Sequence, residues 1–287
     1  MANNTAQYNK KTARELLNTS GIGFSKAKGQ NFLCDNNIIE KIVKFSGIDK
    51  SCGVFEVGPG LGALTLELSK AAEHVTALEL DKRLIPVLHQ VLKEQSNVSI
   101  VQGDILKQDI NKLLNDTMRG LSHHVCANLP YNITTPAITS FIESGAFKSI
   151  TVMVQKEVAL RICAKPGSPE YGAFTVYSNY HTKPEILFDV SPECFYPRPK
   201  VTSSVVKMDS IVNRLLDAES EEILFKIVRA AFGQRRKTLA NALHSVFGNI
   251  YKKDEISKHI KDCGFNVLTR GEALSVEEFV KLSTYFK

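Results

Sequence analysis

The sequence lacks several features that would point to other classes of protein. Its six cysteines include no C-x-x-C pair, and no histidine spacing completes a zinc site, so we expect no metal. No apolar run is long enough to span a membrane, and the polar segment 1–9 has no apolar core of the kind that directs export. Scattered cysteines without an export signal indicate reduced thiols in a cytoplasmic protein that does not bind membranes.

The balance of charge is modestly basic, and the position of the basic residues is more informative than their number. The chain has 287 residues and a formal net charge of +6, which suits one large domain with a smaller one. Basic residues gather within residues 1–30 and again within 229–237. Such clusters suit contacts with a phosphate backbone, although a solvated face or a flexible tail explains each of them equally well.

A four-residue motif, Asn128-Leu129-Pro130-Tyr131, follows the apolar segment 124–127. An asparagine side-chain oxygen and a backbone carbonyl can each accept one N–H of an extruded adenine amine. Pro130 restricts Leu129 to an extended conformation, which gives the Leu129 carbonyl a defined direction. Tyr131 offers a ring on which the base can stack. Taken alone, the motif also fits a strand followed by a proline turn.

A glycine-rich turn lies upstream of this motif. Segment 54–57 predicts a buried strand, turn 58–62 has glycine at alternate positions, and segment 63–70 has helical spacing. This unit lets the backbone approach a nucleotide-like ligand, and it also fits the dinucleotide fingerprint of a nicotinamide or flavin oxidoreductase. Glu56 at the strand end favours the cationic S-adenosylmethionine, as does Pro59, which removes an N–H that a pyrophosphate would use.

Acidic or amide side chains end successive predicted strands. The strand at 75–78 leads to Glu79, the strand at 98–102 leads to Gly103-Asp104, and Asn128 follows 124–127. Ligands of open α/β sheets bind at the edge where the carboxyl ends of parallel strands meet. Glu79 therefore suits the ribose of a cofactor and Asp104 its adenine amine. In isolation, Asp104 also fits an ordinary Gly-Asp turn.

The architecture expected from these patterns is α/β with a mainly parallel sheet over residues 24–208. A flexible basic arm, 1–23, precedes this domain, and a helical RNA-binding domain, 209–287, follows it. The late strands are expected at 152–154, 186–190 and 202–208. The C-terminal helices are expected at 221–246, 254–263 and 276–285, the last with Ser275 as its N-cap.

Over about residues 24–243 these motifs resemble the ribosomal RNA adenine N6,N6-dimethyltransferases of the KsgA or RsmA type, which implies a Rossmann-like S-adenosylmethionine-dependent methyltransferase domain. Besides the motifs above, the resemblance includes the stretches 28–33, 155–159, 171–172, 195–201 and 231–239.

The resemblance implies roles for individual residues. Asn31 and Leu33 would close over the cofactor, and Phe195 would cover the face of the target base opposite Tyr131. The catalytic residues would be Asn128, Leu129, Pro130, Tyr131 and Phe195. The cofactor-binding residues would be Gln30, Asn31, Leu33, Glu56, Gly58, Gly60, Glu79, Leu80, Gly103, Asp104, Ile105 and Asn128. The RNA-binding residues would be Lys28, Arg229, Arg235, Arg236 and Lys237.

The implied reaction is dimethylation of the N6 amines of two adjacent adenosines near the 3′ end of small-subunit, 16S-type ribosomal RNA. The protein would act as a monomer on a pre-ribosomal particle and take part in biogenesis of the subunit. Two alternatives are an erythromycin-resistance type enzyme of large-subunit RNA and a ribosome-assembly binding factor. The stretches 155–159 and 231–239 favour the small-subunit enzyme, and the intact motifs argue against a purely vestigial site.

Overall fold

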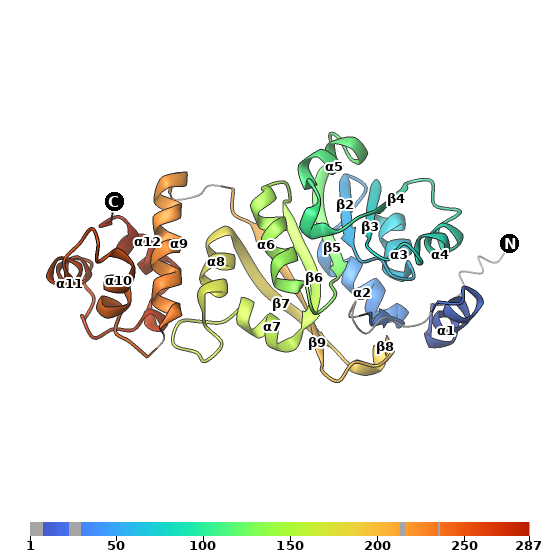
Figure 1. Ribbon diagram of the computed structural model, residues 1–287. Coiled ribbons are helices and arrows are strands. Elements are labelled where there is room, and N and C mark those ends of the chain that lie inside the picture. The colour runs from blue at the N-terminus through green and yellow to red at the C-terminus, as the bar shows by residue number, and fades with distance from the viewer. Residues whose placement is uncertain (1–7, 23–29, 213–215, 235, 287) are drawn as a thin grey trace. The chain divides into compact units, whose positions relative to one another are not determined.

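The computed structural model describes residues 8–22, 30–212, 216–234 and 236–286 (Figure 1). Contacts between residues divide the chain into two compact units. The first comprises the described residues up to Ala159 together with Glu185–Ser210, and the second comprises Leu160–Pro184 with the described residues from Ile211 onward. Residues 160–184 thus group with the C-terminal helices, whereas the sequence interpretation placed them in the first domain.

A seven-stranded sheet has the order β4-β3-β2-β5-β6-β9-β7, and it lies in the first unit except for the first three residues of β7, 182–184. The strands from β4 to β6 pair in parallel and β9 is antiparallel to β6, which confirms the mainly parallel α/β sheet. In this order the strands are Val98–Gln102, His74–Glu79, Cys52–Val57, Ser122–Asn128, Ser149–Gln155, Ser203–Ser210 and Thr182–Val190.

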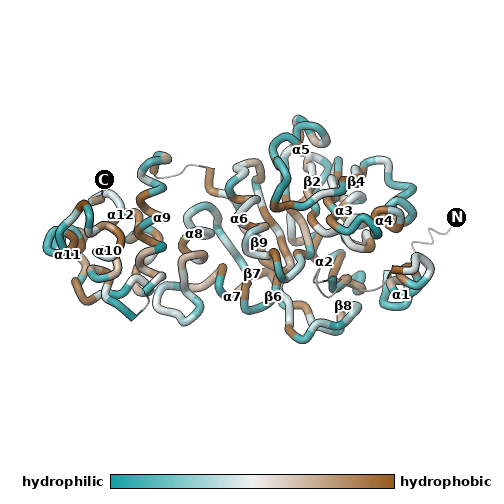
Figure 2. The backbone as a smooth tube through the Cα atoms, in the orientation of Figure 1, coloured by the Kyte–Doolittle hydropathy of each residue, from teal (hydrophilic) through white to brown (hydrophobic). Residues whose placement is uncertain are grey.

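Central strands of this sheet are apolar because helices leave them little contact with water. All six residues of β2 are buried, with Val54 and Phe55 fully enclosed. Figure 2 shows hydrophobic colour along the central strands and hydrophilic colour on α5. The helices of this region are α2 Asn36–Ser46, α3 Ala63–Ala71, α4 Ile85–Val91, α5 Ile110–Thr117, α6 Thr134–Ser144 and α7 Lys156–Ile162.

The register of the parallel strands brings their carboxyl ends to one edge. Val57 pairs with Leu78, Glu79 pairs with Gln102, and Asn128 pairs with Met153. Three of the segments that the sequence analysis singled out therefore begin at the same edge: the glycine turn, the Gly103-Asp104 turn and the Asn128 motif. The expected alignment of the strand ends is confirmed.

Part of the N-terminal arm is ordered, which corrects the expectation of a flexible segment over its described residues. Helix α1 (Lys10–Thr19) begins at Asn9, whose side-chain oxygen accepts hydrogen bonds from the backbone N–H groups of Lys11 and Thr12. Its apolar face buries Ala13 and Leu17. The helix lies against β8 of a small antiparallel ribbon formed by β1 (Phe32–Leu33) and β8 (Phe195–Tyr196).

The second unit has its own helical core. Ser275 caps the last helix, as expected, since its hydroxyl accepts from Glu278 N and the Glu278 carboxylate accepts from Ser275 N. In the described part of the chain no helix has both the length and the apolar content needed to cross a membrane. The helices are α8 Ala173–His181, α9 Ala218–Gly233, α10 Leu239–Phe247, α11 Lys253–Asp262 and α12 Val276–Ser283.

The expected single helix over 221–246 is wrong, because two helices with a turn between them occupy this range. Helix α9 ends at Gly233, and Thr238 is the extended N-cap of α10. Lys237 N donates to Gln234 O, and Leu239 N donates to Thr269 O, so the connecting turn has its own hydrogen bonds. Arg236 and Lys237 consequently lie in this turn and not on a helical face.

Candidate cofactor and target-base site

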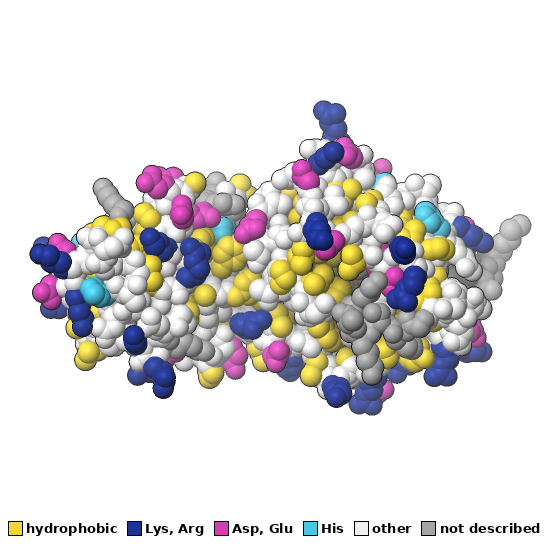
Figure 3. Space-filling view, viewed as in Figure 1, with side chains coloured by type: hydrophobic (Ala, Val, Ile, Leu, Met, Phe, Trp, Pro, Cys, Tyr) yellow, Lys and Arg dark blue, Asp and Glu magenta, His cyan; other side chains and the backbone are white. Residues whose placement is uncertain are grey.

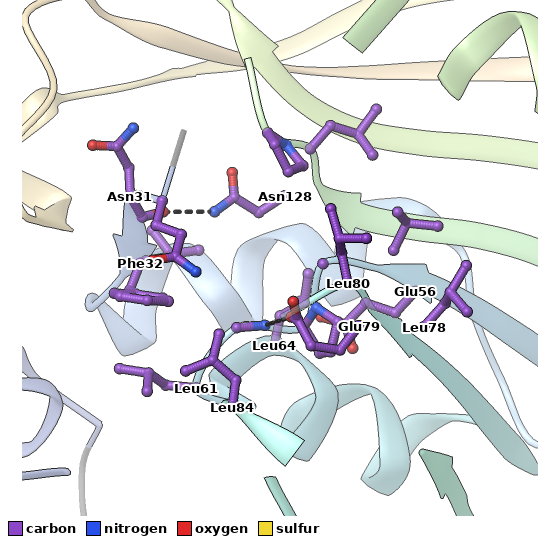
Figure 4. A pocket seen from close by; sticks show the side chains of 18 of the residues that line it. Asn31, Phe32, Glu56, Leu61, Leu64, Leu78, Glu79, Leu80, Leu84 and Asn128 are labelled. Atoms are coloured by element: carbon purple, nitrogen blue, oxygen red, sulfur yellow. Dashed lines mark hydrogen bonds between the residues drawn. The ribbon is translucent and has the colours of Figure 1, made fainter. Parts of the chain in front are cut away.

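A cavity of about 160 Å³ lies at the carboxyl edge of the sheet in the first unit, and it brings together most of the predicted site residues. Figure 4 shows side chains from the strand ends and from residues 31–32 converging on it. Every residue of the predicted cofactor set lines the cavity, together with Leu129, Pro130 and Tyr131. Other lining residues are Tyr8, Phe32, Val57, Pro59, Leu61, Ala63, Leu64, Leu78, Leu84, Asn132 and Ile133.

The glycine turn leaves space where side chains would block the cavity. Gly58 and Gly60 have φ angles of +71° and +59°, a region that L-residues rarely adopt. A Cβ on Gly60 would lie 2.8 Å from Cδ1 of Phe32, and one on Gly58 would lie 3.5 Å from Pro130. The turn is therefore in close contact with two other elements of the site, and a ligand can approach its backbone closely.

Glu79 is buried at the end of β3, where backbone groups hold its carboxylate. Its Oε2 accepts a hydrogen bond from Gly60 N at 3.1 Å, and its Oε1 accepts from Asp81 N at 2.7 Å. These bonds join the glycine turn to the β3 end and fix the carboxylate at the cavity wall. A fixed acceptor at this point suits ribose hydroxyls, as the sequence analysis predicts.

Residues 30–33 form a strap across the strand ends. At one end Gln30 Nε2 donates to Asp81 Oδ2 at 3.1 Å, and Arg83 holds the same buried carboxylate through two further hydrogen bonds. In the middle of the strap the carbonyl of Asn31 accepts from Asn128 Nδ2 at 3.1 Å (Figure 4). At the other end Leu33 pairs with Phe195 in the β1–β8 ribbon.

The hydrogen bond to Asn31 also orients Asn128. It uses the side-chain nitrogen as the donor, so the side chain presents its oxygen, Oδ1, as an acceptor on the other side. Leu129 N donates to Met153 O at 3.2 Å, which extends the pairing with β6 by one residue and fixes the peptide before Pro130. The motif thus has a defined backbone direction at the point where the sequence analysis places a target amine.

Tyr131 is held at its far end. Its hydroxyl lies 2.9 Å from Ser203 Oγ, and Ser203 is fully buried at the start of β9. The tyrosine is half-buried and borders the cavity. Burial raises the pKa of Tyr131, so the ring carries a neutral phenol at physiological pH. A fixed, neutral aromatic ring suits base stacking.

Two further carboxyl groups border the cavity. Asp104 precedes a 3-10 turn (Ile105–Lys107), and its Oδ1 accepts from Leu106 N. Glu56 is fully enclosed, and among the described residues its Oε2 has no hydrogen-bond partner. Burial raises the pKa of Glu56 to about 8, the charge of Glu79 adds to the shift, and the Thr65 hydroxyl opposes it.

These features fit S-adenosylmethionine. Glu56, whose buried Oε2 has no partner among the described residues, lines the cavity with Glu79 and Asp104, and the described lining residues include no lysine, arginine or histidine. Such a site favours a cationic ligand without phosphates. Leu80 and Ile105 add apolar surface beside the carboxyl groups, which suits a nucleoside.

Phe195 and the basic residues lie outside the cavity. Phe195 is 1% exposed, packs in the core cluster that includes Leu33, and is not among the residues that line the cavity. Arg229, Arg236 and Lys237 are exposed in the second unit, whereas Lys28 and Arg235 lie outside the described residues. Figure 3 shows Lys and Arg side chains dispersed over the viewed face without one continuous basic patch.

Sequence reasoning missed three residues with evident positions in the site. Phe32 lies between predicted residues, and its contact with Gly60 was not visible from spacing. Ser203 stood within a predicted strand, but its pairing with Tyr131 joins positions 72 residues apart. Tyr8 stood in the arm expected to be flexible, so no local pattern connected it to the cavity.

The sheet order, the glycine turn and the acidic strand ends define a Rossmann-like, S-adenosylmethionine-dependent methyltransferase. The family model described as "Ribosomal RNA adenine dimethylase" matches residues 23–287. A curated relative, "Ribosomal RNA small subunit methyltransferase A" of Lachnoclostridium phytofermentans, is 44% identical over 271 residues, which cover 94% of this chain and 93% of the relative.

Two solved structures resemble this fold. A dimethyladenosine transferase from Plasmodium falciparum has a TM-score of 0.74 and 25% identity, covering 86% of this chain and 94% of its own. The 23S rRNA methyltransferase ErmE has a TM-score of 0.69 and 23% identity, and the match covers 89% of this chain and 99% of ErmE. The chain belongs to the ribosomal RNA adenine dimethylase family, and this membership removes the oxidoreductase alternative.

We predict that Gly60→Ala weakens binding of S-adenosylmethionine at least roughly tenfold. The φ angle of this residue is unfavourable for alanine, and the added Cβ would displace the Phe32 ring. Isothermal titration calorimetry measures the change. Gly233→Ala is the matched control, since no described residue lies within 4 Å of a Cβ placed there and alanine suits a helix. Equal affinity of the Gly60 variant and the wild type would show that the turn does not contact the ligand.

Glu56→Gln should stabilise the free protein increasingly from pH 5 to pH 8. Between about pH 4.5 and 8 the folded protein retains a Glu56 proton that the unfolded chain has released, so wild-type stability falls as pH rises, by at most about 1.4 kcal/mol per pH unit. Glutamine has no such dependence. Urea unfolding at pH 5, 6.5 and 8 measures the difference, with Glu40→Gln on the exposed face of α2 as control. If the free energies of unfolding of Glu56→Gln and the wild type differed by the same amount at all three pH values, the pKa of Glu56 would not be raised.

Proposed function

We propose that this protein dimethylates the N6 amines of two adjacent adenosines near the 3′ end of small-subunit ribosomal RNA. Its substrate would be a pre-ribosomal particle, on which it would act as a monomer in the cytoplasm. The observation that carries the proposal is the orientation of Asn128, whose amide nitrogen is bound to Asn31 O while its oxygen remains an acceptor beside the cavity. The name of the Lachnoclostridium relative supports the small subunit as the substrate.

The protein's part in the reaction is to orient the target amine. The lone pair of an adenine amine is delocalised into the ring, which makes the nitrogen a poor nucleophile. Asn128 Oδ1 and the Leu129 carbonyl would accept its two hydrogens and bias the nitrogen toward tetrahedral geometry. Tyr131, held by Ser203, would stack on the base and fix its plane. Bound S-adenosylmethionine supplies the methyl group, carried on its sulfonium.

Positioning and preorganised dipoles would supply most of the rate in this arrangement. Each transfer replaces one N–H bond of the amine with an N–CH₃ bond and releases one proton to water. No strong base is required, because methyl transfer leaves a positive charge on N6, and this cation is acidic enough to lose its proton to water. The fixed amide and carbonyl acceptors are sufficient for the first transfer.

Other residues of the predicted set have supporting roles in the proposal. Glu79 would hold the ribose hydroxyls and Asp104 the adenine amine of the cofactor, while the strap 30–33 would cover it. Arg229, Arg236 and Lys237 are exposed and would contact phosphates, in line with a helical RNA-binding unit. Phe195 would have to leave its buried position in order to cover the target base.

The direct test is transfer of labelled methyl from S-adenosylmethionine to undermethylated ribosomal particles, with small and large subunits assayed separately. The expected product is N6,N6-dimethyladenosine in small-subunit RNA. Label confined to large-subunit RNA would assign the erythromycin-resistance type activity instead. Absence of label in both would favour a ribosome-assembly binding factor.

Asn128→Ala should lower the turnover number by roughly 10²- to 10³-fold, the usual loss when one preorganised polar group is removed from a reacting centre. Cofactor affinity, measured by calorimetry, should change far less than turnover. Asn111→Ala is the control, because Asn111 is exposed on α5 and does not line the cavity. Near-normal turnover of the Asn128 variant would rule out the proposed orientation of the amine.

A further inference from the structure

Tyr8 has an unexplained position in the cavity wall. It precedes α1 in the chain, yet it lines the same cavity as the strand-end residues. The residue is 7% exposed, and its hydroxyl is buried without a hydrogen-bond partner among the described residues. A buried, unpaired hydroxyl destabilises the free protein, so a ligand that pairs with it would bind more tightly.

Contacts of α1 hold Tyr8 in this position. Tyr8 packs in the core cluster that also includes Phe32 and Leu33 of the strap. Arg14 on the same helix donates from Nε to the Tyr196 hydroxyl at 3.3 Å, and its guanidinium lies 5.4 Å from the centre of that ring. The described part of the arm is thus attached to the ribbon that ends the strap, and Tyr8 is placed by folded structure.

The hydroxyl is a hydrogen-bond donor at physiological pH. Burial raises the pKa of Tyr8 well above its usual range, and the nearby Cys34 adds to the shift. The phenol therefore keeps its proton. Three other side-chain donors of the cavity wall have partners within the protein: Gln30 Nε2 donates to Asp81, Asn128 Nδ2 donates to Asn31 O, and the Tyr131 hydroxyl pairs with Ser203.

The charges of the cavity leave one group of the cofactor without an evident partner. S-adenosylmethionine has two cationic groups, its sulfonium and its ammonium. The proposed function assigns Glu79 to the ribose and Asp104 to the adenine, which leaves the carboxyl group of Glu56 for these cations. The cofactor also has a carboxylate, which requires donors, and no lysine, arginine or histidine is among the described residues that line the cavity. A neutral donor such as a phenol binds a carboxylate through a charge-assisted hydrogen bond.

We propose that Tyr8 is a cofactor-binding residue whose hydroxyl donates a hydrogen bond to the carboxylate of S-adenosylmethionine. The inference rests on the proposed function for the identity of the ligand. It makes α1 part of the cofactor site, because the helix places Tyr8 against the strap. The arm thereby contributes to cofactor affinity independently of any contact that it makes with RNA.

The test compares two ligands on the same proteins by isothermal titration calorimetry. S-adenosylmethionine carries the carboxylate, and decarboxylated S-adenosylmethionine lacks only that group. Tyr8→Phe removes only the hydroxyl, and we expect it to weaken binding of S-adenosylmethionine by roughly ten- to a hundredfold. Its affinity for the decarboxylated ligand should equal that of the wild type, because the partner of the hydroxyl is absent.

Tyr180→Phe is the matched control, since Tyr180 is a buried tyrosine of the second unit that does not line the cavity. It should bind both ligands as the wild type does. Unchanged affinity of Tyr8→Phe for S-adenosylmethionine would overturn the proposal, and so would equal weakening for both ligands. If the wild type bound neither ligand, the proposed function itself would fail, which separates the two outcomes.

Discussion

The hydrogen bond from Asn128 Nδ2 to the carbonyl of Asn31 is the interaction on which the site depends. It joins the end of β5 to the strap 30–33, which lies almost a hundred residues earlier in the chain. One consequence is mechanical, because the strap closes the cavity over the glycine turn. The other is chemical, because a committed amide nitrogen leaves the side-chain oxygen to receive a target N–H. A single contact therefore couples closure over the cofactor to orientation of the amine.

Charge and burial complement this geometry. Glu79 is fixed by two backbone N–H groups, whereas Glu56 beside it is enclosed and keeps its proton to about pH 8. Two neighbouring carboxyl groups in one apolar wall cannot both remain ionised without a compensating cation. A sulfonium or ammonium group would supply that compensation on binding. The acidic wall thus explains why the family's cationic cofactor suits a glycine turn that resembles a dinucleotide site.

Sequence reasoning predicted those parts of the molecule that depend on local pattern. Buried runs located the parallel strands, and the residues after them, such as Glu79 and Asn128, lie at one edge because parallel strands share their direction. It failed where distant contacts decide the outcome. The arm forms a helix because Ala13 and Leu17 find a surface on the β1–β8 ribbon. The expected long helix ends at Gly233, and a second helix begins at Leu239, whose N–H donates to Thr269 O. No local pattern encodes either partner.

Hydrogen–deuterium exchange of the full-length protein, with and without S-adenosylmethionine, tests the central claim most directly. If the strap and the strand ends form the cofactor site, the ligand should slow exchange in residues 30–34, 58–62, 103–106 and 128–133, with little change in α9 to α12. In Asn128→Ala the ligand should protect residues 30–34 less than in the wild type, and this loss should exceed that in the other three segments, because the strap no longer has its central hydrogen bond. Protection confined to other segments, or equal protection of the strap in the variant, would contradict the account.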